Sequence, residues 1–318
     1  MVTSGPLRIV YFGTPAFAVP TLEALRRSAH PVAAVVTQPD RPRGRGQKWS
    51  DAPVKASAVA AGLPVLQPRV LADADFVGAL RGFDVDLGVV AAYGKILTDE
   101  ILALPRLGMI NVHASLLPRH RGAAPIHRAV IAGDRETGIT IMRVVRALDA
   151  GPMLASSRRA IGSDETSEEI ERDLARLGAD LAVSTIDRLA AGGLVETPQV
   201  DADATYARRL TKDDGRIDWS RPARDIHNLI RGLYPWPHAF TFLERTRLIL
   251  LRSSVSDEDG GALPGTIVEA AGDRLRIAAG SGVVSVLQIQ AEGTRPMSAR
   301  EFLAGHPLPV GATLRVSR

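Results

Sequence analysis

The sequence contains no cysteine among its 318 residues. Disulfide bridges, thiolate nucleophiles and cysteine-based metal sites are therefore excluded. The start of the chain, MVTSGPLRIVYFGTP, lacks the basic segment and the long apolar segment of a secretion signal. No apolar run approaches the roughly 20 residues that a membrane-spanning helix needs. These absences predict a cytoplasmic protein with no membrane partner.

The dinucleotide-binding fingerprint is also missing. The first apolar run ends at Gly13, which Thr14 and Pro15 follow, so the glycines of G-x-G-x-x-G are not there. We therefore do not expect a dehydrogenase.

The net charge of +4 is unevenly distributed. Residues 206–318 hold 16 lysines and arginines against 12 aspartates and glutamates, so the whole excess lies in the last third of the chain. An accessory domain that binds nucleic acid has such an excess. A surplus of this size also arises by chance, and the charge alone leaves both explanations open.

The first two hundred residues alternate apolar strands with helices. We expect strands over 7–13, 31–40, 85–94 and 108–115, and helices over 18–30, 50–64 and 163–193. Ser163 and Thr166 are the candidate N-caps of the long third helix. Strands that are apolar throughout imply a parallel sheet covered by helices on both faces. The pattern predicts a doubly wound, Rossmann-like α/β domain over residues 1–203.

The remaining residues, 204–318, have a different pattern. One short helix is expected within 211–240. Short alternating segments follow, with strands expected over 239–244, 247–253, 265–270, 274–280 and 283–290. Glycine, proline or aspartate separates them, which is typical of a small all-β domain built as a sandwich or a barrel.

The stretch INVHASLLPRHRGAAPIHRA, residues 110–129, brings Asn111 and His113 to the end of a predicted strand. Residues two apart on a strand point to the same side, and ligands bind at the carboxyl ends of strands in open α/β sheets. An amide donates well to a developing oxyanion, and an imidazole donates or accepts near neutral pH. Asp149, after another apolar run, is the best candidate to orient the imidazole. A polar strand end without function is the alternative.

This set has no serine or cysteine nucleophile, so it does not form a triad for covalent catalysis. It suits the binding of an oxyanion and the movement of protons during a direct transfer.

The run NVHASLLPRHRGAAPIHRAVIAGDRETGITIM…LDAGPML resembles the signature of the folate-dependent formyltransferase family. The resemblance implies that Asn111, His113 and Asp149 are catalytic. It implies direct transfer through a tetrahedral oxyanion, without a covalent enzyme intermediate and without a metal. It also implies a 10-formyltetrahydrofolate site, whose expected residues are Ser115, Leu116, Leu117, Pro118, Val90 and Tyr93.

Basic segments point to the formyl acceptor. The segment QPDRPRGRGQKWSDAPVK sets Arg43, Arg45 and Lys48 among glycines and prolines, which disfavour a helix. Clustered arginines and lysines suit contacts with phosphates, although a solvated surface loop has the same composition. The tRNA-directed members of the family carry a similar insertion, which enters the acceptor arm, and the arginine matching Arg45 is the important one there. A Lys-Lys pair is commoner where this chain has Gln47-Lys48.

The segment KDDGRIDWSRPARDIHNLIRGLYPWPHAF resembles the entry to the second domain of the same members. Lys212 and Arg216 are the candidates for contacts with the tRNA backbone. We expect Trp219, Tyr234 and Trp236 to pack in the core and not to stack on bases. The resemblance implies that the second domain is an OB-like barrel that binds tRNA.

The resemblance thus implies a reaction and its partners. The formyl group of 10-formyltetrahydrofolate would pass to the α-amine of methionine on initiator methionyl-tRNA, for translation initiation, in a monomeric enzyme. Two other functions remain possible at this stage. One is formylation of an amino sugar nucleotide, and the other is tRNA binding by a protein whose catalytic core is inactive.

Overall fold

The computed structural model describes residues 5–43, 48–258 and 260–316, and the chain forms two compact units. The first unit comprises Met1–Pro125, Thr137–Arg159 and Glu171–Ala207. The second comprises Ile126–Glu136, Ala160–Ile170 and Arg208–Arg318. Two short segments within the first two hundred residues thus belong to the second unit. The predicted domain boundary between residues 203 and 204 stays a prediction.

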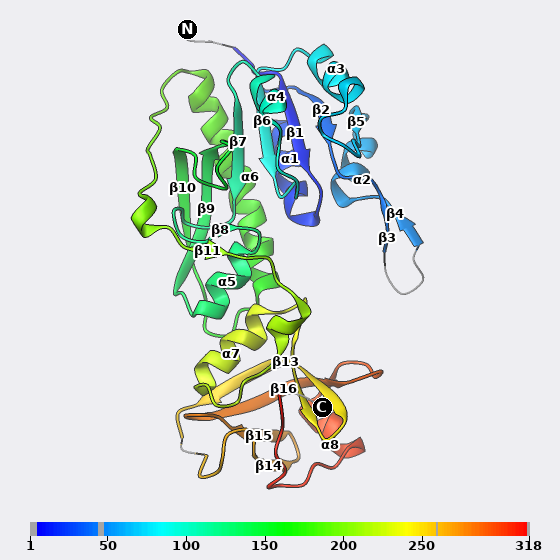
Figure 1. Cartoon of the computed structure of the whole chain (residues 1–318), viewed down its shortest axis with the longest axis vertical. Coiled ribbons are helices and arrows are strands. Elements are labelled where there is room, and N and C mark those ends of the chain that lie inside the picture. The colour runs from blue at the N-terminus through cyan, green and yellow to red at the C-terminus, as the bar shows by residue number, and fades with distance from the viewer. Residues whose placement is uncertain (1–4, 44–47, 259, 317–318) are drawn as a thin grey trace. The chain divides into compact units, whose positions relative to one another are not determined.

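The first unit is built around a seven-stranded sheet with the order β10-β9-β7-β6-β1-β2-β5 (Figure 1). The strands are β1 (Ile9–Gly13), β2 (Val32–Val36), β5 (Val65–Leu66), β6 (Leu87–Ala91), β7 (Met109–His113), β9 (Glu136–Arg143) and β10 (Met153–Ala160). From β5 to β7 all neighbours are parallel. The predicted doubly wound α/β fold is confirmed. The sequence did not indicate that β9 pairs antiparallel with β7.

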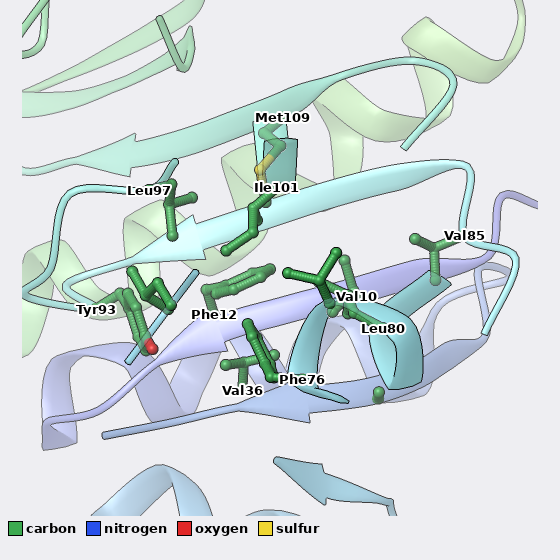
Figure 2. Packing of buried hydrophobic residues seen from close by; sticks show 13 residues of the cluster. Val10, Phe12, Val36, Phe76, Leu80, Val85, Tyr93, Leu97, Ile101 and Met109 are labelled. Atoms are coloured by element: carbon green, nitrogen blue, oxygen red, sulfur yellow. The ribbon is translucent and has the colours of Figure 1, made fainter. Parts of the chain in front are cut away.

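One face of this sheet is covered by α3 (Ala74–Gly82) and α4 (Asp99–Ala103). Their apolar side chains pack with those of β1 and β2 in one buried cluster, in which Phe12 and Phe76 meet between the sheet and α3 (Figure 2). Helix α3 begins at Asp73, whose carboxylate accepts the free N–H groups of the first turn.

The opposite face is covered by α1 (Val19–Arg27) and α6 (Ser167–Ala190). Gly178 of α6 lies so close to the sheet that a Cβ there would be 2.8 Å from a methyl group of Val112. Helix α6 begins with a capping box in which Thr166 and Glu169 hold each other's backbone N–H groups. Of the two predicted N-caps, Ser163 and Thr166, the structure therefore selects Thr166.

Two shorter helices complete this part of the chain, α2 (Pro53–Ala60) and α5 (Pro125–Ala132). In the described part of the chain, no helix combines the length and the apolar character needed to cross a bilayer.

The second unit is an antiparallel barrel. Its strands are β12 (Ala239–Leu243), β13 (Thr246–Ser256), β14 (Ile267–Ala271), β15 (Arg274–Ala278), β16 (Val283–Ala291) and β17 (Met297–Ser298), in the order β12-β13-β16-β15-β14, with β17 beside β16. The sheet closes through the C-terminal segment, because Arg315 pairs with Phe242 of β12 and Thr313 pairs with Thr266 just before β14. The predicted all-β domain is confirmed.

Besides α5, which lies in the second unit from Ile126 onward, that unit contains α7 (Ala223–Gly232) and α8 (Ala299–Gly305). Helix α7 was expected. Helix α8 was not, although the sequence carries its signal: Ser298 and Glu301 are spaced as a capping box, and both of its hydrogen bonds form.

The aromatic residues near α7 divide between core and surface. Trp219 is buried, and its indole N–H donates to Oγ1 of Thr241 at 3.0 Å. Tyr234 is half-buried. Trp236, by contrast, is 51% exposed, so its predicted place in the core is wrong. It lies in the connection between α7 and β12.

Candidate active site

Strand β7 presents Asn111 and His113 on one side and Val112 on the other. Val112 faces α6, so the two polar residues lie on the opposite face. Asn111 is half-buried between Val90 of β6 and Met142 of β9. Within residues 5–43, 48–258 and 260–316, its side-chain amide makes no hydrogen bond, so its N–H groups remain available to a ligand.

His113 is 5% exposed and is held by the loop that follows it. Its Nε2 lies 3.0 Å from the carbonyl oxygen of His120. A carbonyl only accepts, so Nε2 must carry a hydrogen. The nitrogen left for chemistry is Nδ1, which lies 3.7 Å from Oδ2 of Asp149. This distance exceeds a direct hydrogen bond, so the two groups are not bonded to each other and each can bind a substrate atom or a water.

Asp149 comes from the connection between β9 and β10, residues 144–152. The backbone of Asp149 is left-handed, with φ of 48°, which is unfavourable for a residue with a side chain. Oδ2 of Asp149 accepts the N–H of Gly122 at 2.8 Å, so the loop after β7 also orients the carboxylate. Because β9 runs antiparallel to β7, Asp149 reaches His113 through a folded connection and not from the end of a parallel strand.

The loop of Ser115, Leu116, Leu117 and Pro118 is fixed by internal hydrogen bonds. The Ser115 hydroxyl donates to the carbonyl of Arg119 at 2.7 Å, and Oγ1 of Thr140 donates to the carbonyl of Ser115 at 2.7 Å. Thr140 is the β9 partner of His113 and also accepts the N–H of Leu117. The loop is therefore anchored beside the imidazole, with Leu116 and Pro118 half-buried at its surface.

The two expected folate residues of the segment after β6 differ in position. Val90 pairs directly with Asn111 and is half-buried, next to the candidate catalytic amide. Tyr93 is 1% exposed and belongs to the apolar cluster of Figure 2. Burial raises the pKa of its hydroxyl to about 12. Its carbonyl accepts from Thr14 and from Gln38, so it joins the loops after three strands and keeps its ring inside the core.

The three groups together provide complementary chemistry. Asn111 offers an unused donor, His113 one uncommitted ring nitrogen, and Asp149 a carboxylate opposite that nitrogen. Such a set suits the stabilisation of a developing oxyanion and a proton relay. Among the described residues, no group of three or more histidine, aspartate or glutamate side chains is placed to hold a metal ion.

Comparison with known proteins gives two matching family models. The model named "Formyl transferase" matches residues 7–186, and the model named "Formyl transferase, C-terminal domain" matches residues 209–307. A methionyl-tRNA formyltransferase of Caldanaerobacter subterraneus subsp. tengcongensis is 46% identical over 310 residues, with 97% of this chain and 100% of the relative covered. One of Methylococcus capsulatus is 47% identical over 302 residues, with 95% and 98% covered. The chain belongs to the methionyl-tRNA formyltransferase family. It is thus a formyl-transferring enzyme.

Solved structures with the same fold include other formyltransferases. WlaRD, a sugar 3N-formyl transferase crystallised with dTDP and 5-N-formyl-THF, superposes with a TM-score of 0.66 at 14% identity, over 91% of this chain and 99% of that one. HypX from Aquifex aeolicus in complex with tetrahydrofolic acid gives 0.62 at 14% identity, over 94% and 47%. At these identities the likeness concerns the fold alone.

The basic insertion holds three of the residues predicted to contact tRNA. Its described part forms a short two-stranded ribbon. β3 (Arg41–Arg43) pairs antiparallel with β4 (Lys48–Ser50), so the backbones of Arg43 and Lys48 lie opposite each other. Arg45 lies outside the described residues.

Both ends of the insertion are tied to Lys55 of α2. Its ammonium group forms ion pairs with Asp40, before β3, and with Asp51, after β4. Lys55 was not singled out from the sequence. Its spacing of four residues from Asp51 is a signal for one of the two pairs.

The other two expected tRNA residues lie at a 3-10 turn, η3 (Lys212–Gly215). Lys212 is exposed, and Arg216 is exposed and paired with Asp213 at 3.1 Å. Asp214 holds the turn in place: although burial opposes it, hydrogen bonds from Thr211 and two arginines lower its pKa to about 2. A charged turn with a rigid base is thus presented at the surface of the second unit.

Sequence reasoning missed the residues that support the catalytic set. Thr140 binds the loop that follows His113, Gln199 binds the loop that carries Asp149, and Arg121 donates to Gln199 from the first of these loops. Arg121 and Thr140 lie within the quoted signature, but nothing in their spacing indicated what they bind. Gln199 lies 50 residues from Asp149 in a segment without a motif.

Proposed function

We propose that this enzyme transfers the formyl group of 10-formyltetrahydrofolate to the α-amine of methionine on initiator methionyl-tRNA, for translation initiation. The observation that carries this proposal is the likeness to methionyl-tRNA formyltransferases over nearly the whole chain, second unit included. Full-length likeness supports the same acceptor as well as the same donor, because the second unit is part of the match.

In the proposed reaction the amine nitrogen attacks the formyl carbon, and the bond from that carbon to N10 of the folate breaks. Asn111 donates to the carbonyl oxygen while it carries negative charge. Its unpaired amide supports this role, since no protein group has to be displaced. The transfer is direct, because no serine or cysteine nucleophile accompanies the set.

His113 and Asp149 handle the charge and the protons. In the proposed mechanism the protonated imidazole presents Nδ1 to the reacting oxygen, since Nε2 is committed to the His120 carbonyl. Asp149 stabilises the imidazolium. It also receives the proton that the amine loses and passes it on to N10, directly or through a water. Oriented donors of this kind need no metal ion.

The folate site is proposed at the loop of Ser115, Leu116, Leu117 and Pro118 and at Val90. The rigid anchoring of this loop on Thr140 supports a preformed wall beside the amide. We assign Tyr93 a backbone role there, because its ring is buried.

The proposed tRNA contacts are Arg43, Arg45 and Lys48 of the insertion, and Lys212 and Arg216 at η3. Clustered cations suit phosphate groups, whose binding weakens steeply with salt. In this proposal the C-terminal domain, residues 204–318, binds the tRNA, and the enzyme works as a monomer in the cytoplasm.

The deciding experiment is formyl transfer from 10-formyltetrahydrofolate to methionyl-initiator tRNA, run beside methionyl-elongator tRNA and free methionine. We expect product with the initiator species only. Transfer to an amino sugar nucleotide, with none to tRNA, would overturn the proposed acceptor. Tight tRNA binding without any transfer would overturn the proposed chemistry.

A further inference from the structure

The segment 197–207 contacts both the loop that follows His113 and the loop that carries Asp149. Thr205 accepts the backbone N–H of His120 through its hydroxyl and that of Arg121 through its carbonyl, at 2.9 and 2.8 Å. The next residues, β11 (Tyr206–Ala207), pair parallel with β8 (Arg121–Gly122). This part of the segment fixes the loop whose His120 carbonyl holds His113.

The other end of the segment fixes the Asp149 loop. The carboxamide nitrogen of Gln199 donates to the carbonyl of Asp149 at 2.9 Å and to that of Gly151 at 2.8 Å. The carboxamide oxygen accepts from Nε of Arg121 at 3.0 Å. One side chain thereby links the backbone of the Asp149 loop to the loop after β7.

Arg121, which donates to Gln199, is itself held in place. It is 3% exposed, and its second contact is an ion pair with Asp201 at 2.8 Å. Gly122, its neighbour, needs to be glycine: φ is 118°, and a Cβ would lie 2.8 Å from the carbonyl oxygen of Ala207. The loop after β7 and the segment 197–207 therefore pack closely against each other at Gly122 and Ala207.

The backbone of Asp149 needs such support. A non-glycine residue with φ of 48° is strained, and strained conformations persist only where surrounding contacts over-determine them. The two hydrogen bonds from Gln199 bind the carbonyl groups on either side of Ala150, within the turn that carries this strain. The carboxylate also depends on the Gly122 N–H, which Arg121 precedes directly.

We propose that Gln199 is a positioning residue for formyl transfer: it holds the Asp149 loop so that the carboxylate stays opposite Nδ1 of His113. This inference rests on the proposed function, because it assigns Gln199 an effect that passes through Asp149. Gln199 itself touches neither reacting molecule in this role.

The first test is Gln199→Met, which removes the hydrogen bonds of the carboxamide and keeps the side-chain volume nearly unchanged. We expect kcat to fall about 10- to 100-fold, since small displacements of a catalytic group have effects of that size. KM for the folate and for the tRNA should change little. Gln199→Glu separates the two halves of the contact, because a carboxylate still accepts from Arg121 but cannot donate to the two carbonyls. It should lose as much activity as Gln199→Met.

A double-mutant cycle with Asp149→Asn identifies the path of the effect. If Gln199 acts through Asp149, adding Gln199→Met to Asp149→Asn lowers kcat no further. Multiplying effects would overturn the inference, and so would an unchanged kcat in Gln199→Met. An Asp149→Asn enzyme with full activity would instead overturn the proposed role of Asp149, so the two failures are distinguishable.

The matched control is Gln290→Met in β16, whose carboxamide also donates to a backbone carbonyl, that of Thr294. It should leave kcat unchanged. Thermal unfolding of all variants completes the set. A Gln199→Met enzyme that loses activity only in proportion to lost folded protein would contradict a positioning role.

Discussion

The proposed catalytic site and the proposed tRNA-binding turn differ in how far their side chains are buried and how firmly they are held. His113 is almost fully buried, and its ring nitrogens face a backbone carbonyl and a carboxylate at defined distances. Lys212 and Arg216 are exposed side chains on a charged turn. Charge development in a reaction needs donors fixed within fractions of an ångström. Phosphate binding draws on several cations whose contributions nearly add. Changes in the first region should therefore act on kcat and changes in the second on KM and its salt dependence.

The largest expected effect is that of removing the donor at the reacting oxygen. Asn111→Ala should lower kcat by about 10²–10³, as loss of an oxyanion donor does elsewhere. Asn111→Asp has nearly the same shape but cannot donate, and it should be as inactive. Single-turnover kinetics with saturating tRNA measures the chemical step. If Asn111→Ala instead acted mainly by raising KM, the expected difference between the catalytic site and the tRNA-binding turn would not hold.

The next largest effect is expected from replacing Glu169, a carboxylate of the second unit that forms an ion pair with Arg252. Hydrogen bonds from Arg252 and Thr166 lower the pKa of Glu169 from 4.5 to about 2. A carboxyl with a depressed folded-state pKa stabilises the fold above its unfolded value and loses that effect as the pH falls. Glu169→Gln should reduce the free energy of unfolding by about 1 kcal/mol at pH 7.

The pH dependence makes this second prediction specific. The difference between Glu169→Gln and the unchanged protein should shrink below pH 4.5 and disappear near pH 2. Urea denaturation at pH 7 and thermal scans at decreasing pH provide the comparison. An equal difference at all pH values would mean that the ion pair with Arg252 is not its source.

A smaller effect is expected from the exposed cations themselves. Lys212→Ala should raise KM for methionyl-tRNA several-fold and leave kcat nearly unchanged. Its plot of log affinity against log salt should be shallower by about one unit, as for one lost phosphate contact. Lys95→Ala is a control of like charge, since Lys95 donates to the backbone carbonyls of Pro68 and Arg69, in the connection after β5. An equal change of slope in both variants would argue against a specific contact at Lys212.

The smallest effect is expected from removing the ion pairs that hold the ends of the ribbon formed by β3 and β4. Lys55→Met removes the ion pairs to Asp40 and Asp51 while Arg43 and Lys48 remain. We expect a roughly two- to threefold higher KM for tRNA, because surface ion pairs contribute at most about 1 kcal/mol. Steady-state kinetics at low and high salt measures it. A larger fall in kcat than in affinity would place the ribbon in the chemistry and not in binding.

The sequence by itself determined the structural class of both domains and the position of many of their elements. Apolar runs between helices indicated the doubly wound domain, and short alternating segments indicated the β domain, because hydrophobic periodicity is a local property. Asn111 and His113 could be placed together for the same reason, as residues two apart on one strand. Asp149 followed as the candidate partner of the imidazole, and the family signature implied a catalytic role for all three residues.

Only the tertiary structure decided what each of these groups faces. The antiparallel pairing of β9 set the direction from which Asp149 approaches. The burial of Tyr93 and the exposure of Trp236 depended on neighbours far along the chain, which no local pattern encodes. Gln199 illustrates this most clearly: its carboxamide is matched by carbonyls and a guanidinium that come within reach only when segment 197–207 folds back over both loops. Long-range hydrogen bonds of this kind have no periodicity, and folding alone brings their partners together.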